Sequence, residues 1–369
     1  MTKAAELAKM GEVLTNSQIG GRRNIVINGA MQVAQRGTSA TGLGASDGYF
    51  TVDRFQLNFS STSARLTMTQ DSPTDLSGFT KALKLDCTTA DTSIGADEFI
   101  ILHYKLEGQD VQQLKKGTSD AEKITVSFYV KANANATYTL EIEDVDNNRY
   151  NSQEFSVTTS WNRVSLTFDG DTTGVLGNDN GNSIRLNFWL HVGSDFAGGT
   201  HTSNVWHTTN NQRVGDNQTS FADSTDRTFF LTGLQMEVGS QATPFEHRSF
   251  GEELALCERY FFVLAKGSDN TNENIGNAFG HSASQMECVV RFGPRSGMRV
   301  APTLEHASGT NYYEVLNNSE NAQFNSLQYY NATKRSALIY RNSISVTLNG
   351  NYRFVLGNAS AHISLDAEL

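Results

Sequence analysis

Apolar and polar residues alternate along short segments through much of the chain, and this alternation constrains the fold more than any other feature. In 55–59 and 124–130 the apolar side chains stand at every second position. Further strand-like segments are 137–144, 153–157, 161–168, 184–192 and 228–237. Because successive side chains of a strand point to opposite faces, alternating segments predict short strands with one buried face. Together they predict an antiparallel jelly-roll β-sandwich over residues 49–247.

The C-terminal part of the sequence predicts a second, smaller unit. A short helix is predicted at 249–261, where Ser249 and Glu252 have the spacing of a capping box. Strand signals resume at 285–292, 336–340, 344–348, 353–356 and 363–369. A chain of 369 residues is long enough for two cores. We therefore predict a mainly β protein of three regions: a short N-terminal helix and a strand in 1–48, the sandwich in 49–247, and a connecting helix with a C-terminal β knob domain in 248–369.

Composition excludes several classes of function. The formal net charge is −10 and only 18% of the residues are charged, so the chain lacks the concentrated Lys and Arg field that nucleic-acid binding requires. It has no run of about 18 apolar residues and no secretory signal at its start, so we predict no membrane insertion and synthesis in a host cytoplasm. Glycine is frequent, which suits tight turns such as the one predicted at Asn28-Gly29 within a strand segment, 24–37. The cysteines Cys87, Cys257 and Cys288 form no CxxC motif and are predicted to be buried.

The first residues predict a docking element. Residues 3–14 are good helix formers, and Leu7, Met10 and Leu14 are spaced so that they form one apolar stripe. A helix of about twelve residues is marginal on its own in water, so the stripe needs a partner. That partner is a second copy of the chain or another protein. The alternative is a leader that packs back on its own domain.

Candidate catalytic residues are few. Asp144 and Asp146 could form the carboxylate pair of a glycoside hydrolase, but they fall in a predicted hairpin turn, where Asp and Asn are common. No Gly-x-Ser-x-Gly or His-Glu-x-x-His motif is present, and His201 and His207 lack a third metal ligand at a suitable spacing. We therefore predict that the chain is not an enzyme and has no catalytic residue, metal site or cofactor. A structural Ca²⁺ elsewhere in the sandwich stays open, because the sequence does not place its ligands.

Binding signals lie in two places. Sugars bind to aromatic faces that are flanked by polar side chains. A loop without strand signal, 195–224, and a tyrosine-rich stretch of the C-terminal domain supply both kinds of group. The candidate glycan contacts are Trp206, His207, Asn210 and Arg213 in the loop, and Tyr312, Tyr313, Tyr329 and Tyr330 in the C-terminal domain. For the tyrosines the alternative is a place in the core, because neighbouring residues of a strand alternate between its faces.

Several segments resemble a known family. They are 6–17, the run Arg23-Asn-Ile-Val-Ile-Asn-Gly-Ala-Met-Gln-Val-Ala-Gln-Arg-Gly37, 49–55, 231–260, and 298–303 with the terminal 366–369. Within 49–55, Asp53-Arg54-Phe55 matches the Asp-Arg-Trp or Asp-Arg-Phe that is usual in that family. In order and spacing, across the whole chain, these segments resemble the tail-fibre-type virion structural proteins of marine tailed bacteriophages.

The resemblance implies a virion protein of the phage tail. Such proteins are usually homotrimers that attach through the N-terminus to other tail or virion proteins, and their middle sandwich is similar to carbohydrate-binding modules. We expect adhesion to host surface polysaccharide or lipopolysaccharide, in which several weak sites on one particle add up. Two alternatives stay open. One is a polysaccharide depolymerase of the tail, and the other is an architectural collar or capsid-decoration protein without receptor binding.

Overall fold

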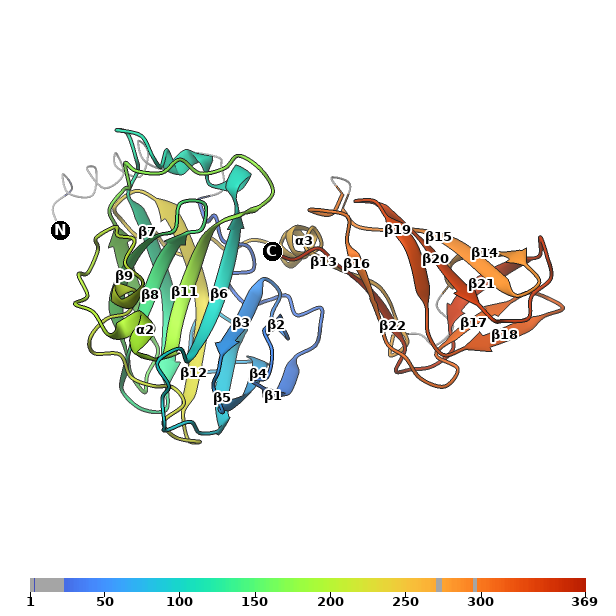
Figure 1. Cartoon of the computed structure of the whole chain (residues 1–369), viewed down its shortest axis with the longest axis horizontal. Helices are drawn as coiled ribbons and strands as arrows, with labels where there is room; N and C mark the ends of the chain where they lie inside the picture. The colour runs from blue at the N-terminus through green and yellow to red at the C-terminus, as the bar shows by residue number, and fades with distance from the viewer. Residues whose placement is uncertain (1–2, 4–22, 270–273, 295–296) are drawn as a thin grey trace. The chain divides into compact units, whose positions relative to one another are not determined.

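The computed structural model describes residues 3, 23–269, 274–294 and 297–369, and it is mainly β, as the alternation predicts (Figure 1). The described chain divides into two compact units, with Glu253 at the end of the first and Leu254 at the start of the second. The terminal Leu369 belongs to the first unit. The predicted apolar stripe of Leu7, Met10 and Leu14 lies outside the described residues. No helix in the described ranges is long and apolar enough to cross a membrane.

The first unit is an antiparallel sandwich of two six-stranded sheets. Sheet A has the order β1 (Ser39–Leu43), β4 (Arg65–Asp71), β5 (Ala82–Thr89), β12 (Thr228–Val238), β7 (Ile124–Ala132) and β10 (Asn162–Phe168). Sheet B has the order β2 (Gly48–Tyr49), β3 (Phe55–Ser60), β6 (Phe99–Glu107), β11 (Asn182–Val192), β8 (Ala136–Asp144) and β9 (Arg149–Val157). Phe128 of sheet A packs edge-on against Phe155 and Phe188 of sheet B, with ring centroids 5.1 Å apart in both pairs. The predicted sandwich is confirmed.

Short helices lie in the connections of this unit. They are η1 (Gly108–Asp110) and η2 (Gln112–Leu114) after β6, and α2 (Ser194–Ala197) and η3 (Asn210–Gln212) after β11. The last two belong to the long connection between β11 and β12, where the sequence predicts a loop.

The predicted strand at 24–37 is wrong, although its turn is confirmed. The main-chain N–H of Met31 donates to the carbonyl of Asn28 at 2.9 Å and closes the turn. The Asn28 side chain then bonds to both main-chain groups of Val33 and to the carbonyl of Asp53. The Asp53 carboxylate in turn accepts from the main chain of Gln35 at 2.8 Å. These side-chain bonds take the place of a strand ladder.

The Asp53-Arg54-Phe55 motif is part of the scaffold of the first unit. Arg54 is 1% exposed and has a positive φ of 76°. Its Nη2 donates to the carbonyl of Lys105 at 2.8 Å, and its guanidinium lies 5.5 Å from the ring centre of Tyr104. Phe55 packs on the same ring at 5.2 Å. The motif therefore joins the start of β3 to β6.

The helix α3 (Phe250–Cys257) begins where the capping box predicts it. The N–H of Glu252 donates to the Ser249 hydroxyl at 3.3 Å. The helix ends four residues before the predicted end, and the boundary between the two units falls inside it.

The second unit contains a three-stranded sheet and a seven-stranded sheet. Sheet C has the order β13 (Phe261–Lys266), β22 (His362–Asp366) and β16 (Thr303–His306). Sheet D has the order β18 (Asn321–Phe324), β17 (Tyr313–Leu316), β21 (Asn351–Leu356), β14 (Asn274–Ser282), β15 (Gln285–Arg291), β20 (Ser336–Asn342) and β19 (Gln328–Ala332). Its core contains a row of stacked rings, in which Phe324 lies 5.9 Å from Tyr313 and 6.1 Å from Phe354.

The predicted strand at 344–348 is wrong. Ile344 and Val346 are buried, as their alternation predicts. They make only single, long main-chain hydrogen bonds of 3.3 Å to Ser284 and Ala283, so the segment packs like a strand without joining a ladder. The three cysteines are buried, as predicted, and within the described residues they form no disulfide.

Candidate functional site

The outer face of sheet B carries a buried polar network. The strand register sets Asn187 of β11 opposite Glu141 of β8 on one side and His103 of β6 on the other. Its Nδ2 donates to Glu141 and Glu143 at 2.8 and 2.9 Å, so its Oδ1 faces Nδ1 of His103 at 2.6 Å. Burial lowers the pKa of His103 to about 3. The imidazole is therefore neutral at pH 7, and it donates the proton on Nδ1 to Asn187.

Arg213 fastens the long connection over this face. Its Nε and Nη2 donate to the two oxygens of Glu141 at 2.8 and 2.7 Å, and Glu141 is fully buried. The guanidinium lies 4.0 Å from the ring centre of Tyr150 and 5.1 Å from that of Trp189. Burial alone would lower the pKa of Arg213, but the charge and hydrogen bonds of Glu141 and the charge of Glu143 raise it. Arg213 therefore forms a structural ion pair with Glu141, and its Nε and Nη2 already donate within the protein.

The other loop candidates are also held by the protein. Trp206 is half-buried and donates from Nε1 to the carbonyl of Asp169 at 2.6 Å. His207 exchanges two main-chain hydrogen bonds with Tyr150, at 2.8 and 3.0 Å. Burial lowers the pKa of its imidazole. Asn210 is exposed, and its amide donates to the carbonyl of Asp195 at 3.0 Å. Their role in glycan contact stays a prediction.

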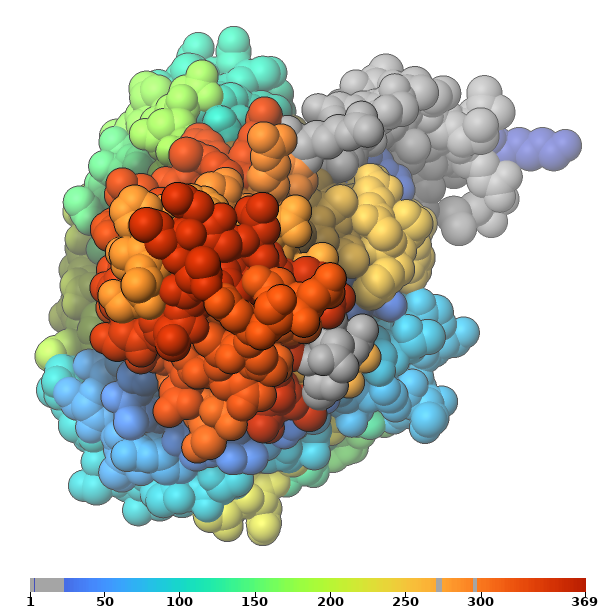
Figure 2. Space-filling model, turned by 90° about the vertical axis from the view of Figure 1, so that its right-hand side faces the viewer, coloured from blue at the N-terminus to red at the C-terminus, as the bar shows by residue number. Residues whose placement is uncertain are grey.

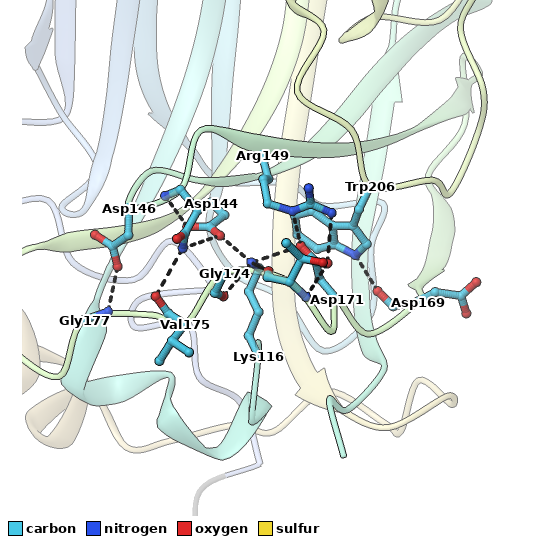
Figure 3. A network of polar contacts seen from close by, with 12 residues as sticks. Lys116, Asp144, Asp146, Arg149, Asp169, Asp171, Gly174, Val175, Gly177 and Trp206 are labelled. Atoms are coloured by element: carbon cyan, nitrogen blue, oxygen red, sulfur yellow. Dashed lines mark hydrogen bonds and ion pairs between the residues drawn. The ribbon is translucent and has the colours of Figure 1, made fainter. Parts of the chain in front are cut away.

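Asp144 and Asp146 face different partners and form no acid–base pair (Figure 3). Asp144 is fully buried and binds the ammonium group of Lys116. The same ammonium contacts Asp171 at 3.0 Å and the carbonyls of residues 173 and 174 at 2.8 and 3.1 Å. Asp146 accepts from the N–H of Gly177 at 2.8 Å. The predicted turn between β8 and β9 is confirmed. The ammonium group of Lys116 lies among the carboxylate and carbonyl oxygens named above.

The tyrosines of the second unit divide between core and surface. Tyr313 is fully buried, and its hydroxyl contacts the carbonyls of Ala307 and His362 at 2.7 and 2.9 Å. Burial raises the pKa of this phenol, and the residue belongs to the core. Tyr312 is half-buried. Tyr329 and Tyr330, on the edge strand β19, are 37% and 54% exposed.

An aromatic row crosses the outer face of sheet D, on the unit coloured orange to red in Figure 2. Register sets Phe279 of β14 opposite Glu287 of β15, and Glu287 opposite Tyr340 of β20. The ring of Tyr330 stacks on Tyr340 with centroids 4.1 Å apart and planes 18° apart. Val289, two residues after Glu287, is 57% exposed on the same face. We call Phe279, Glu287, Val289, Tyr330 and Tyr340 the outer strip of sheet D.

The outer strip offers a mixed apolar and polar surface. Tyr330, Phe279 and Val289 present apolar faces to solvent. The Glu287 carboxylate lies 3.7 Å from Nδ1 of the exposed His281. Sequence analysis singled out only Tyr330 of this strip. The missed signal was in the predicted strand 336–340, whose residues alternate between the core side of Ile339 and the outer side of Tyr340.

Known proteins give little further information. No protein-family model and no curated protein matches the chain. Among solved structures, it is similar to the carbohydrate-binding module TmCBM61 in complex with β-1,4-galactotriose, at a TM-score of 0.31 and 9% identity, over 59% of this chain and 99% of that one. A family 11 carbohydrate-binding module from Clostridium thermocellum, in complex with a β-1,3-1,4-mixed-linked tetrasaccharide, has a TM-score of 0.28 and 11% identity, over 56% and 98% of the two chains. An exo-β-agarase has a TM-score of 0.30 and 9% identity, over 60% and 25%. Similarity of this degree leaves the ligand of this chain to be argued from its own residues.

Proposed function

We propose that the chain is a structural virion protein of a tailed bacteriophage, a homotrimeric tail-fibre subunit without enzymatic activity that contacts glycans of the host surface. The segments that resemble tail-fibre-type proteins support the virion role and the docking through the N-terminus. The observation that carries the glycan contact is the exposed outer strip of sheet D, with the stacked rings of Tyr330 and Tyr340 at its edge.

The outer strip suits a sugar ring by its chemistry. A pyranose has an apolar face of C–H groups that packs on an aromatic ring, and hydroxyls at its rim that need polar partners. Tyr330 and Phe279 offer such rings, while Glu287 and His281 lie beside them. One site of this kind binds weakly, but three copies on one rigid particle raise the avidity.

The test is binding of the full chain to a panel of immobilised bacterial lipopolysaccharides and surface polysaccharides. Tyr330→Ala removes the exposed ring and should cost about 1 kcal/mol, which is about five-fold in affinity. Phe250→Ala is the matched control, because Phe250 is 57% exposed on α3 and lies outside the strip. Equal binding by Tyr330→Ala and the unsubstituted chain would remove the strip from the proposal.

The same panel separates the two alternatives. A depolymerase would release new reducing ends from one of the polysaccharides. The contact between Asp144 and Lys116 speaks against the one carboxylate pair that the sequence suggests. A purely architectural protein would bind none of the surfaces. Sedimentation of the purified chain tests the trimer, and a monomer at micromolar concentration would contradict it.

A further inference from the structure

Three potential metal ligands meet in the first unit, away from the polar network of Arg213. Asp91 follows β5, Glu98 directly precedes β6, and His191 lies near the end of β11. Their nearest ligand atoms all lie within 4.8 Å of one another. An irregularity in the pairing of β11 with β6 falls just before His191, and such irregularities redirect side chains. The three residues are 5%, 9% and 0% exposed, so the cluster is buried.

Two of the three side chains have second partners that orient them. Asp91 accepts from the Thr62 hydroxyl at 2.9 Å and from the N–H of Ser63 at 2.7 Å. Nδ1 of His191 lies 2.7 Å from the Ser220 hydroxyl, which directs Nε2 toward the carboxylates. A hydrogen bond on the far nitrogen is what fixes a metal-binding histidine in its tautomer and orientation.

Glu98 has no such second partner. Within the described part of the chain, the one hydrogen-bond or ion-pair partner of its carboxylate is Nε2 of His191, at 3.4 Å. A charge-assisted N–H···O bond is about 2.7–2.9 Å long, so this separation is poor for an imidazolium and a carboxylate. Two ligands held about 2.1 Å from a tetrahedral metal lie about 3.4 Å apart. The buried and otherwise unpartnered carboxylate thus has the spacing of a metal ligand.

We propose that Asp91, Glu98 and His191 bind a divalent transition metal of the Zn²⁺ class. One imidazole nitrogen with two carboxylate oxygens is a donor set that Zn²⁺ accepts, and a water molecule would complete the coordination. Ca²⁺ prefers a shell of oxygen ligands, so the imidazole favours the transition metal. The site does not depend on glycan binding and goes beyond the proposed adhesion.

The bound metal would fasten the ends of several connections to one another. Gly193 approaches the segment before Glu98 closely, since its N–H donates to the Glu98 carbonyl at 2.8 Å. The loop of Ser220 is bonded to Asp91, because the N–H of Asp91 donates to the carbonyl of Ala222 at 2.7 Å. The ion would join the connection between β5 and β6 to the end of β11, with the loop of Ser220 bonded beside it, which gives the site a structural role.

The experiment is titration of the purified full chain, stripped with chelator, with Zn²⁺ alone by calorimetry and with Co²⁺ alone by visible absorption. One equivalent should bind, and Zn²⁺ should raise the unfolding temperature. His191→Ala and Glu98→Gln should each weaken binding by at least about ten-fold. His281→Ala is the matched control, because His281 is an exposed histidine beside a glutamate in the second unit, and it should bind as the unsubstituted chain does.

Three results would overturn the site. They are no uptake of Zn²⁺ or Co²⁺ at millimolar concentration, uptake that His191→Ala and Glu98→Gln leave unchanged, and uptake of Ca²⁺ in preference to Zn²⁺. If His191→Ala does not fold, Glu98→Gln decides, because glutamine keeps the size of the side chain and removes its charge. Neither glycan binding nor the trimer enters this readout.

Discussion

Protonation of His103 should make the first unit less stable as the pH falls from neutral to mildly acidic. Burial lowers the pKa of His103 from 6.5 to about 3, and the charges of Arg185, Lys105 and Arg213 act in the same direction. The unfolded chain takes up a proton near pH 6.5, whereas the folded unit does not until the pH reaches about 3. Stability is therefore full above the unfolded pKa and is lost between these two values.

The expected loss between pH 7 and pH 5 is about 2 kcal/mol. Its size depends on the pKa of the unfolded chain, because at pH 5 the folded imidazole is still neutral for any folded pKa well below 5. For a unit of this size the loss corresponds to a decrease of about 4–8 °C in unfolding temperature. The charge of His103 should contribute nothing further below pH 3.

The three tryptophans of the chain make this measurement specific, since Trp161, Trp189 and Trp206 all lie in the first unit. Denaturant unfolding followed by tryptophan emission at pH 7 and pH 5 should give the loss for the unsubstituted chain. His103→Gln keeps a hydrogen-bonding group beside Asn187 but does not titrate, so most of the difference should vanish. If His103→Gln keeps the full pH dependence, the neutral buried imidazole is refuted.

Three further predictions use the same unfolding assay. Arg213→Ala leaves the buried Glu141 without its bidentate partner and should lower the free energy of unfolding by about 3–5 kcal/mol. Arg213→Lys should restore only part of that free energy. A loss below about 1 kcal/mol for Arg213→Ala would mean that other contacts hold the loop. Lys116→Met strands Asp144 in the same way and should cost a similar amount at pH 7, whereas an unchanged midpoint would show that water replaces the ammonium. Gly193→Ala should destabilise the unit and weaken Zn²⁺ binding, because the added Cβ would lie 2.0 Å from the Gly95 carbonyl oxygen. In the control Gly251→Ala the added Cβ meets no atom within 4 Å, and the alanine should stabilise α3 by about 0.5–1 kcal/mol.

Alternation predicted the sandwich correctly where only one face of a strand is buried. Residues 55–59 lie in β3 and residues 124–130 lie in β7, and Phe55 and Phe128 of these strands are buried in the core. The strand β6 escaped notice because both of its faces are covered. Its first four residues, 99–102, are all apolar, and polar residues alternate with apolar ones only from His103 on; its outer residue Ile101 packs with Trp189 and Val214 under the long connection. Period two is lost where both faces of a strand are covered.

Sequence patterns indicated which residue types the candidate sites contain, but not which residues contact one another. Arg213 and Glu141 are 72 residues apart in the sequence, and nothing in their spacing indicates a bidentate pair. The same holds for Asp91, Glu98 and His191, which sheet topology brings together after a separation of 93 residues between the last two. Local patterns report which face a residue takes. Partners across a sheet depend on strand order, which local patterns do not contain.

Aromatic side chains on the outer faces of sheets B and D differ in exposure, and this difference indicates where a ligand would bind. On sheet B, Trp189 is fully buried and the half-buried ring of Tyr150 carries the guanidinium of Arg213 over one face, so these rings are less open to a sugar than an exposed one. On sheet D the stacked Tyr330 stays 54% exposed, on an edge strand that has neither lysine nor proline to protect it. Unprotected edges invite pairing with another chain, so the outer strip would serve glycan contact or trimer assembly, and the two uses would compete for one surface. Tyr330→Ala separates them: loss of glycan binding by an intact trimer assigns the strip to adhesion, whereas loss of the trimer assigns it to assembly and moves the search for the glycan site elsewhere.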